Sequence, residues 1–184
     1  MIEKLTLITG NSGKAEEFGR LLGIKVNHVK LDLPEIQHTD VREVSKIKVQ
    51  TAYGQLKKPV FVDDTGLTFD AWGELPGALI KFFMDNVGND GLLEMLGDNE
   101  NRRARVTTSL GYMDENGLKV AIGVVSGTIA NAPTGDNGFG YDPIFIPDGQ
   151  PDGQTKTFAE MTSSEKDNIS MRALAAQNLI DQLQ

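Results

Sequence analysis

The chain has 184 residues, of which 39% are hydrophobic, and its formal net charge at pH 7 is −8. This size and apolar content suit one compact domain over residues 1–184, and the absence of cysteine excludes disulfides, thiolate catalysis and cysteine-bound zinc. An acidic chain is a poor partner for a nucleic-acid polymer, because phosphate backbones require a basic face. We find no long apolar run, so we expect no signal peptide or membrane span and a cytoplasmic location.

Periodicity and turn residues in the first half predict alternating strands and helices. The predicted strands cover residues 5–8, 26–31 and 59–62, and the predicted helices cover residues 14–22 and 40–56. A loop then contains Gly66, Gly73, Pro76 and Gly77. Two short helices follow, over residues 78–84 and 92–96.

The second half begins with two long strand patterns, over residues 103–113 and 118–130, separated by a tight hairpin turn at Asn116-Gly117. A short strand over residues 143–146, a surface loop over residues 147–154 and a helix over residues 168–183 complete the chain. Because both strand–helix and hairpin connections occur, the expected fold is α/β, with a central mixed sheet flanked by helices.

A glycine-rich turn follows the first strand and contains Thr9, Gly10, Asn11, Ser12, Gly13 and Lys14. Backbone N–H groups at a helix start attract anions, and Lys14 adds a positive charge, so the turn is a candidate phosphate site. It is not a P-loop, which would need Gly at Ile8 and Ser or Thr at Ala15. The alternative is an ordinary strand–helix turn capped by Asn11 or Ser12.

Three carboxylates are candidates for metal binding or water activation. Asp63 and Asp64 end the third predicted strand and point to opposite faces, so one can enter a site while the other makes structural hydrogen bonds. The alternative is a solvated turn. Glu43 fits a capping box with Asp40 as N-cap, and Lys48 on the same helix is by default a solvated lysine.

Two aromatic residues, Phe139 and Tyr141, alternate with Gly138 and Gly140. Glycine lets a ligand approach the backbone closely, and stacking of a base on an aromatic ring contributes about 1–3 kcal/mol. One of the two rings could instead be a core residue. Arg172, which follows along the chain, could contact such a ligand or simply be solvated.

Taken together, the chain resembles the inosine triphosphate pyrophosphatases, also called Ham1-like or noncanonical purine nucleoside triphosphate pyrophosphatases. The resemblance runs nearly end to end and is specific because five motifs occur in order: residues 9–14, 62–67, 75–77, 138–145 and 157–172. It implies hydrolysis of ITP, dITP and XTP to the monophosphate and pyrophosphate. It also implies an elongated α/β fold with a cleft between two lobes, a Mg²⁺ requirement and a homodimer.

The resemblance also implies residue roles. The turn from Thr9 to Lys14 would hold the phosphates, with Lys48 beside them and Lys14 stabilising the negative charge. Asp64 would bind the metal and accept a proton from the attacking water, and Glu43 would be the second metal ligand. The remaining substrate contacts would be Thr65, Phe139, Gly140, Tyr141, Asp142, Lys166, Ser170 and Arg172, with the two aromatic rings flanking the base.

One residue departs from the family pattern of Ser-His-Arg, because the chain has Ser170-Met171-Arg172. Methionine cannot donate a hydrogen bond to a 6-oxo group, and Met171 also falls on the apolar stripe of its helix, where it would pack inward. Discrimination would then rest on Arg172 and backbone donors, so we expect weaker selection of keto over amino purines than in the family. Two alternative functions remain at this point. One is a nucleotide-binding protein without turnover, and the other is a pyrophosphatase for modified pyrimidine nucleotides.

Overall fold

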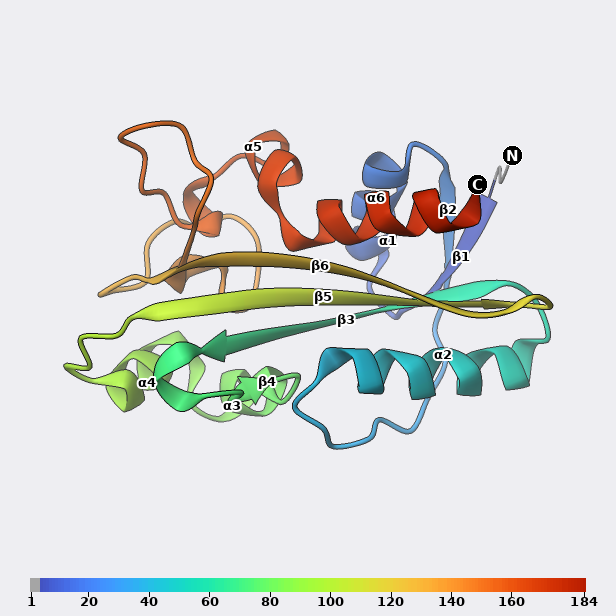
Figure 1. Ribbon diagram of the computed structural model, residues 1–184, viewed down its shortest axis with the longest axis horizontal. Coiled ribbons are helices and arrows are strands. Elements are labelled where there is room, and N and C mark those ends of the chain that lie inside the picture. The colour runs from blue at the N-terminus through green and yellow to red at the C-terminus, as the bar shows by residue number, and fades with distance from the viewer. Residues whose placement is uncertain (1–3) are drawn as a thin grey trace.

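The computed structural model describes residues 4–184 and contains one mixed seven-stranded sheet with helices on both faces (Figure 1). The strand order is β2-β1-β3-β5-β6-β7, and β4 pairs with β3. The strands are β1 (Lys4–Ile8), β2 (Lys25–Val29), β3 (Val60–Phe69), β4 (Pro76–Gly77), β5 (Arg103–Asp114), β6 (Gly117–Ile129) and β7 (Phe145–Pro147). The predicted α/β fold with a central mixed sheet is therefore confirmed.

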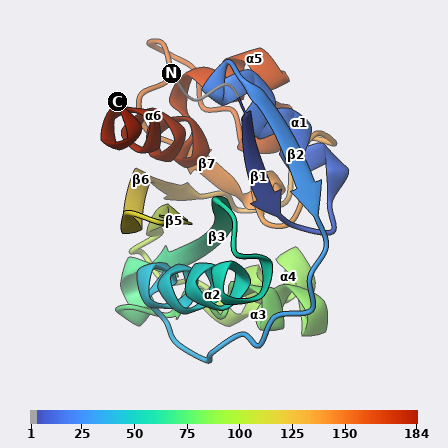
Figure 2. The ribbon, with the colours of Figure 1, turned by 90° about the vertical axis from the view of Figure 1, so that its right-hand side faces the viewer.

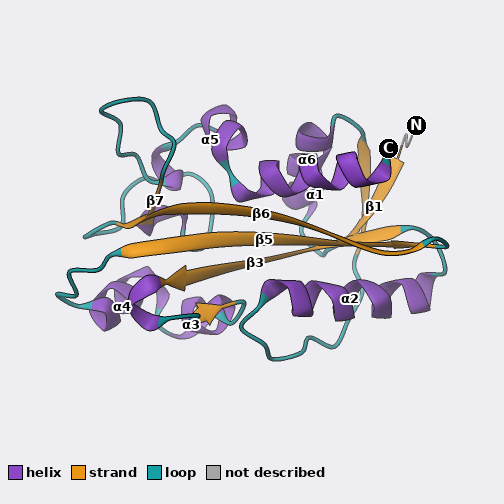
Figure 3. Cartoon of the chain, viewed as in Figure 1, coloured by secondary structure: helices purple, strands orange, loops and turns teal. Residues whose placement is uncertain are grey.

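Helices cover the sheet in two layers, which Figures 1 and 3 show edge-on. On one face lie α1 (Ser12–Leu22), α5 (Ser163–Ile169) and α6 (Met171–Leu183). On the other face lie α2 (Val41–Leu56), α3 (Ile80–Asn86) and α4 (Gly88–Leu96). None of the described helices is both long enough and apolar enough to cross a membrane.

The predicted hairpin joins β5 to β6, and their pairing runs from Arg103 opposite Thr128 to Asp114 opposite Gly117. Gly117 has a φ of 116°, which favours glycine, and the Asp114 carboxylate accepts a hydrogen bond from the Asn116 N–H at 2.8 Å. The turn chemistry in the sequence therefore accounts for the register of the two longest strands.

The third strand is longer than predicted. It continues to Phe69, because all ten of its residues pair with β5, so Asp63 and Asp64 lie inside the strand and Gly66 is not in a loop. Pro76 and Gly77 were also predicted to lie in the loop, but they form the short strand β4, which pairs with β3. Long-range pairing here overrides the local preference of glycine and threonine for a turn.

Other boundaries also differ from the prediction. The second strand ends at Val29, the second short helix begins at Gly88, and the predicted last helix over residues 168–183 is two helices. The break lies at Ser170, whose backbone is extended with φ −77° and ψ 153°. This break separates α5 from α6 and lets Ser170 cap the start of α6.

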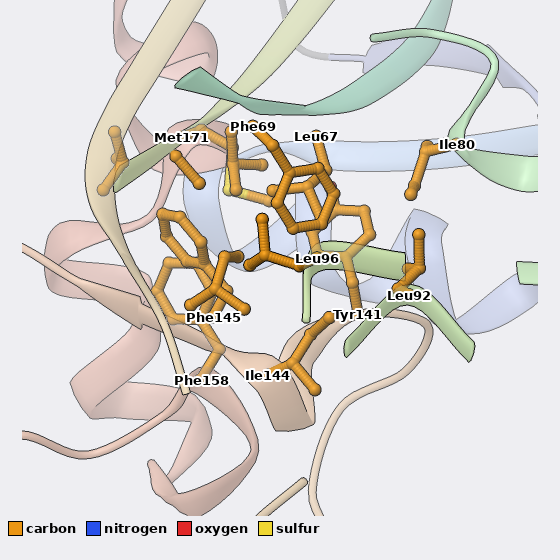
Figure 4. Close-up of a cluster of buried hydrophobic side chains, with 14 of the residues drawn as sticks. Leu67, Phe69, Ile80, Leu92, Leu96, Tyr141, Ile144, Phe145, Phe158 and Met171 are labelled. Atoms are coloured by element: carbon orange, nitrogen blue, oxygen red, sulfur yellow. The ribbon is translucent and has the colours of Figure 1, made fainter. Parts of the chain in front are cut away.

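Three hydrophobic clusters hold the two layers to the sheet. On the α1 and α6 face, Phe18 packs edge-to-face on Phe61 with ring centroids 5.4 Å apart. On the α2 face, Val49 and Ala52 pack against Val62. A third cluster, shown in Figure 4, joins the sheet to α3, α4 and the segment around residues 141–158. In the first part of β3, Phe61 therefore faces α1 and α6, whereas Val60 and Val62 face α2.

The sheet has a gap along one edge of β3. Strand β1 pairs with β3 only where Leu7 meets Phe61, and β4 pairs with β3 only from Leu67 onward. Between these points, over residues 62–66, that edge of β3 has no strand partner among the described residues, and Figure 2 shows β1 and β2 splaying away from β3. Side chains from both faces of β3 can therefore reach one opening.

Candidate active site

The two adjacent carboxylates of β3 lie at this opening and point to opposite faces. The side chain of Asp63 is 1% exposed and contacts residues of α1 and α6, whereas the side chain of Asp64 is 9% exposed and contacts α2. The predicted orientation of the two side chains to opposite faces is confirmed, and which of them enters a site stays a prediction. Each carboxylate therefore needs a separate chemical explanation.

Asp63 is surrounded by positive charge. Its Oδ2 accepts a hydrogen bond from Lys14 Nζ at 2.8 Å and lies 3.5 Å from Arg172 Nε. Burial raises the pKa of the Asp63 carboxyl, but the charges of Lys14 and Arg172 outweigh burial and lower that pKa to about 2. Asp63 is thus a permanently charged anchor for two cations.

Asp64 is less completely paired. Its Oδ1 accepts a hydrogen bond from Lys48 Nζ at 2.7 Å, but its Oδ2 is buried without a hydrogen-bond partner in the described chain. Burial raises the pKa of the Asp64 carboxyl, and the Lys48 ammonium offsets only part of that rise. A buried carboxylate oxygen without a partner fits the binding of a divalent cation.

The second carboxylate near Asp64 is Glu35, which the sequence analysis missed. Lys48 Nζ lies 3.4 Å from Glu35 Oε2 while also bonding Asp64, so one ammonium connects the two acids. Glu35 belongs to an irregular segment between β2 and α2. Such a segment has no helical or strand periodicity from which the direction of the Glu35 side chain could be predicted. Its only local signal is Pro34, which favours an extended chain at Leu33.

Glu43, predicted as a metal ligand, has other contacts in the structure. Its Oε1 accepts a hydrogen bond from Lys46 Nζ at 2.7 Å, one turn along the exposed side of α2. Asp40 caps α2 through the Arg42 N–H as expected, but the Asp40 N–H donates to His38 Nδ1, so the predicted capping box does not form. The contacts of the described residues place Glu35, rather than Glu43, with Asp64.

The glycine-rich turn starts α1 and is held by its own side chains. Asn11 is the N-cap and accepts hydrogen bonds from the N–H groups of Gly13 at 2.9 Å and Lys14 at 3.4 Å. The Thr9 hydroxyl accepts from the Asn11 N–H at 3.1 Å. The expected capping role of Asn11 is confirmed, and phosphate binding by this turn stays a prediction.

A cavity of about 250 Å³ joins this turn to the aromatic segment. Its walls include Gly13 and Lys14 on one side and Phe139 and Lys166 on the other. The Phe139 ring is 49% exposed, and the Arg172 guanidinium carbon lies 4.9 Å from its centroid. Residues predicted to bind the phosphates and residues predicted to bind the base thus line one cavity. Asp64 lies on the other face of β3, beside the edge that has no strand partner among the described residues.

Asp142 supports this cavity from behind. Its Oδ2 accepts hydrogen bonds from the Phe139 N–H at 2.8 Å and from Lys166 Nζ at 2.6 Å. A Cβ at Gly138, which has a φ of 76°, would lie 2.0 Å from the same oxygen, so only glycine fits. Asp142 is therefore occupied in fixing the turn and Lys166, and its predicted contact with the base would be indirect.

Tyr141 and Ser170 do not line the cavity as predicted. Tyr141 is buried in the cluster of Figure 4 with Ile144, so of the two aromatic candidates it is the core residue. Ser170 is the N-cap of α6, and its Oγ accepts a hydrogen bond from the Ala173 N–H at 3.2 Å. Thr65 Oγ donates to Asp63 Oδ1 at 3.3 Å and thus supports that carboxylate.

Met171 packs inward. It is 1% exposed and belongs to the cluster of Figure 4, so its missing hydrogen-bond donor does not face the cavity. The inward packing of Met171 on the apolar stripe of its helix is therefore confirmed. The expected weaker selection of keto purines stays a prediction, and a side chain buried in this cluster is not placed to cause it.

Replacement of Met171 by histidine is accordingly expected to destabilise the fold without sharpening selectivity. Placing an imidazole in an apolar cluster should cost about 2 kcal/mol, or lower Tm by roughly 5 °C for a chain of this size. Thermal unfolding and the ratio of kcat/KM for ITP and ATP measure both effects. A clear gain in the ITP-to-ATP ratio would show that residue 171 does read the base.

Arg172 has donors that the protein leaves unused. Its side chain is 3% exposed, and Nε is buried without a hydrogen-bond partner among residues 4–184. The nearest carboxylates, Asp63 and Glu17, lie 3.5 and 3.6 Å away. A buried guanidinium held by charge but not by hydrogen bonds is available to a ligand with acceptor atoms.

Close packing of α6 on the sheet fixes the position of Arg172. A Cβ at Gly123 of β6 would lie 1.9 Å from the Met171 carbonyl oxygen and 2.6 Å from the Ala175 nitrogen, so the helix touches the strand backbone there. Only glycine allows this distance.

Gly123→Ala is therefore expected to push the start of α6 off the sheet. Overpacking of this kind costs about 1–3 kcal/mol, and the shift of Arg172 should also lower kcat/KM for ITP. The matched control is Gly54→Ala in α2, where a Cβ meets nothing within 4 Å and helix propensity favours alanine. Equal Tm values for Gly123→Ala and the wild type would contradict the packing argument.

A larger cavity, of about 490 Å³, lies between the start of α2 and the sheet, and Thr107 of β5 and Val124 of β6 line it. Its charged side chains are already paired, Arg42 with Asp40 at 3.1 Å and Arg105 with Glu74 at 3.2 Å. The smaller cavity, with the buried Nε of Arg172 nearby and without a hydrogen-bond partner among the described residues, is chemically the better site.

Comparisons with known proteins agree over almost the whole chain. The model of the Ham1 family matches residues 5–182. The inosine triphosphate pyrophosphatase 2 of Trypanosoma cruzi is 43% identical over 175 residues, covering 94% of this chain and 88% of the relative. A dITP/XTP pyrophosphatase of Methanopyrus kandleri is 38% identical over 182 residues, covering 97% and 95%. The solved structure of the Staphylococcus aureus Ham1 protein is 29% identical, with a TM-score of 0.84 and coverage of 98% and 97%.

Proposed function

Because this chain belongs to the Ham1 family, we propose that it hydrolyses noncanonical purine nucleoside triphosphates, ITP, dITP and XTP, to the monophosphate and pyrophosphate. The observation that carries the proposal is the cavity lined by both Lys14 and Phe139. It joins a cationic turn suited to phosphate to an exposed ring suited to a base. Such an enzyme removes damaged nucleotides from the nucleotide pool.

The base end selects the purine. The exposed Phe139 ring provides a stacking surface, and Arg172 provides a guanidinium whose buried Nε has no hydrogen-bond partner among residues 4–184. A carbonyl oxygen at purine position 6 accepts such a donor, whereas the amino group of adenine would place donor against donor. Selection of keto purines thus depends on the hydrogen-bond donors of one buried arginine, Arg172.

The phosphate end is built from the start of α1. The Thr9-to-Lys14 turn offers backbone N–H groups and the Lys14 ammonium, and Lys48 adds a second ammonium from α2. Both ammonium groups already contact β3 carboxylates, so each is oriented before substrate arrives. They stabilise the negative charge that develops on the departing pyrophosphate.

The acidic pair Glu35 and Asp64 would hold the divalent cation, and we infer Mg²⁺. The cation, when bound, neutralises polyphosphate charge. Asp64 orients the water that attacks the α-phosphorus in line, and it accepts the proton.

Pyrophosphate release from a nucleotide panel tests the proposal. With Mg²⁺, turnover of ITP, dITP and XTP should exceed that of ATP by about a hundredfold, and EDTA should abolish it. Binding of ITP without release would instead identify a nucleotide-binding protein. Faster release from a modified pyrimidine triphosphate would identify the other alternative.

We further propose a homodimer located in the cytoplasm. Exposed apolar side chains, among them Leu75, Phe82 and Val124 at 45%, 56% and 46%, are candidates for a subunit contact, and the absence of cysteine suits a reducing compartment. Sedimentation of the purified chain at micromolar concentration measures the assembly directly.

A further inference from the structure

Asp63 takes no part in the cation binding or proton transfer described above, yet it is among the most deeply buried charges of the described chain. Its side chain is 1% exposed, and it lies inside β3 opposite Leu110 of β5. Thr65 donates to its Oδ1 at 3.3 Å, which leaves Oδ2 for other partners. The Asp63 carboxylate is therefore held in a fixed position by the sheet and can position the groups that contact it.

The partners of Oδ2 come from two different helices, α1 and α6. Lys14 Nζ, at the start of α1, donates to it at 2.8 Å, and Arg172 Nε, at the start of α6, lies 3.5 Å from it. Lys14 is the phosphate-side cation and Arg172 the base-side cation. One oxygen atom therefore contacts the recognition groups for both ends of the nucleotide.

We propose that Asp63 is a positioning residue that couples recognition of the base to binding of the phosphates. This inference rests on the proposed function and adds a residue to its selectivity. A 6-oxo base satisfies the outer N–H groups of Arg172 and leaves Nε beside Asp63. An amino base repels the guanidinium, and because Lys14 shares the same oxygen, the disturbance reaches the phosphate end.

The first test compares wild type with Asp63→Asn, using pyrophosphate release from ITP and from ATP. The variant keeps the shape of the side chain but loses its charge. We expect kcat/KM for ITP to fall and the ITP-to-ATP ratio to shrink by about tenfold. The control is Asp148→Asn, which loses the exposed ion pair with Arg103 and should leave the ratio unchanged.

A merely structural role for Asp63 predicts a different result. Both nucleotides would then lose activity by the same factor, and an unchanged ratio in folded Asp63→Asn would overturn the proposal. A wild-type chain that releases no pyrophosphate from any purine triphosphate would instead refute the proposed function. Failure of the Asp63 proposal can therefore be told apart from failure of the proposed function.

The second test does not need Asp63→Asn to fold. Lys14→Met, Arg172→Met and the double variant are compared for ITP affinity by calorimetry, with Asp63 present. We expect the two losses to be coupled, with a combined effect that departs from the product of the single effects by about fivefold. Independent losses would overturn the proposal, because two cations that share one anchor cannot act independently.

Discussion

Asp64→Asn is expected to lower kcat for ITP by about 10³-fold while ITP still binds, because asparagine keeps the shape of the side chain but cannot accept a proton or bind a cation with full charge. Asp64 carries the one buried carboxylate oxygen in the described chain that lacks a hydrogen-bond partner. Steady-state kinetics give kcat, and calorimetry gives the affinity for ITP.

The control for this experiment is Asp85→Asn, an exposed residue of α3 that pairs with Lys81. It should leave both kcat and affinity unchanged. Near-normal turnover in Asp64→Asn would remove Asp64 from the chemistry, and loss of folding would be visible in its melting curve.

Glu35→Gln is expected to raise the Mg²⁺ concentration needed for half-maximal activity by roughly tenfold or more, because it removes one anionic ligand from the acidic pair. Glu43→Gln is the matched comparison, since the same chemical change removes only a contact with Lys46 on the exposed side of α2. A Mg²⁺ titration of each variant at saturating ITP measures the requirement. The opposite ranking of the two variants would return the ligand role to Glu43.

Sequence patterns predicted those features of the fold that depend on local chemistry. The Asn116-Gly117 turn set the register of β5 and β6, and Asn11 and Asp40 cap α1 and α2 as their spacing indicates. The length of β3 could not be predicted in this way, because Gly66 is strand only through its pairing with Thr107. Ser170 divides the last helix, although its capping hydroxyl was visible in the sequence.

The candidate site shows the same limit. Phe139 and Tyr141 have nearly identical glycine surroundings, and only the tertiary fold exposes the first and buries the second. Glu35 and Glu43 are both acids close to α2, but the bridge from Lys48 to Asp64 selects the first. Spacing along the chain identifies residue types for the chemistry, whereas contacts across the sheet decide which of them act.

The most direct test of the central claim is a crystal structure of Asp64→Asn with ITP and Mg²⁺. The account predicts hypoxanthine against Phe139 with its 6-oxo group on Arg172, and the triphosphate on the turn from Thr9 to Lys14 with the cation at Glu35. A nucleotide bound in the larger cavity at the start of α2, away from Phe139, would contradict it.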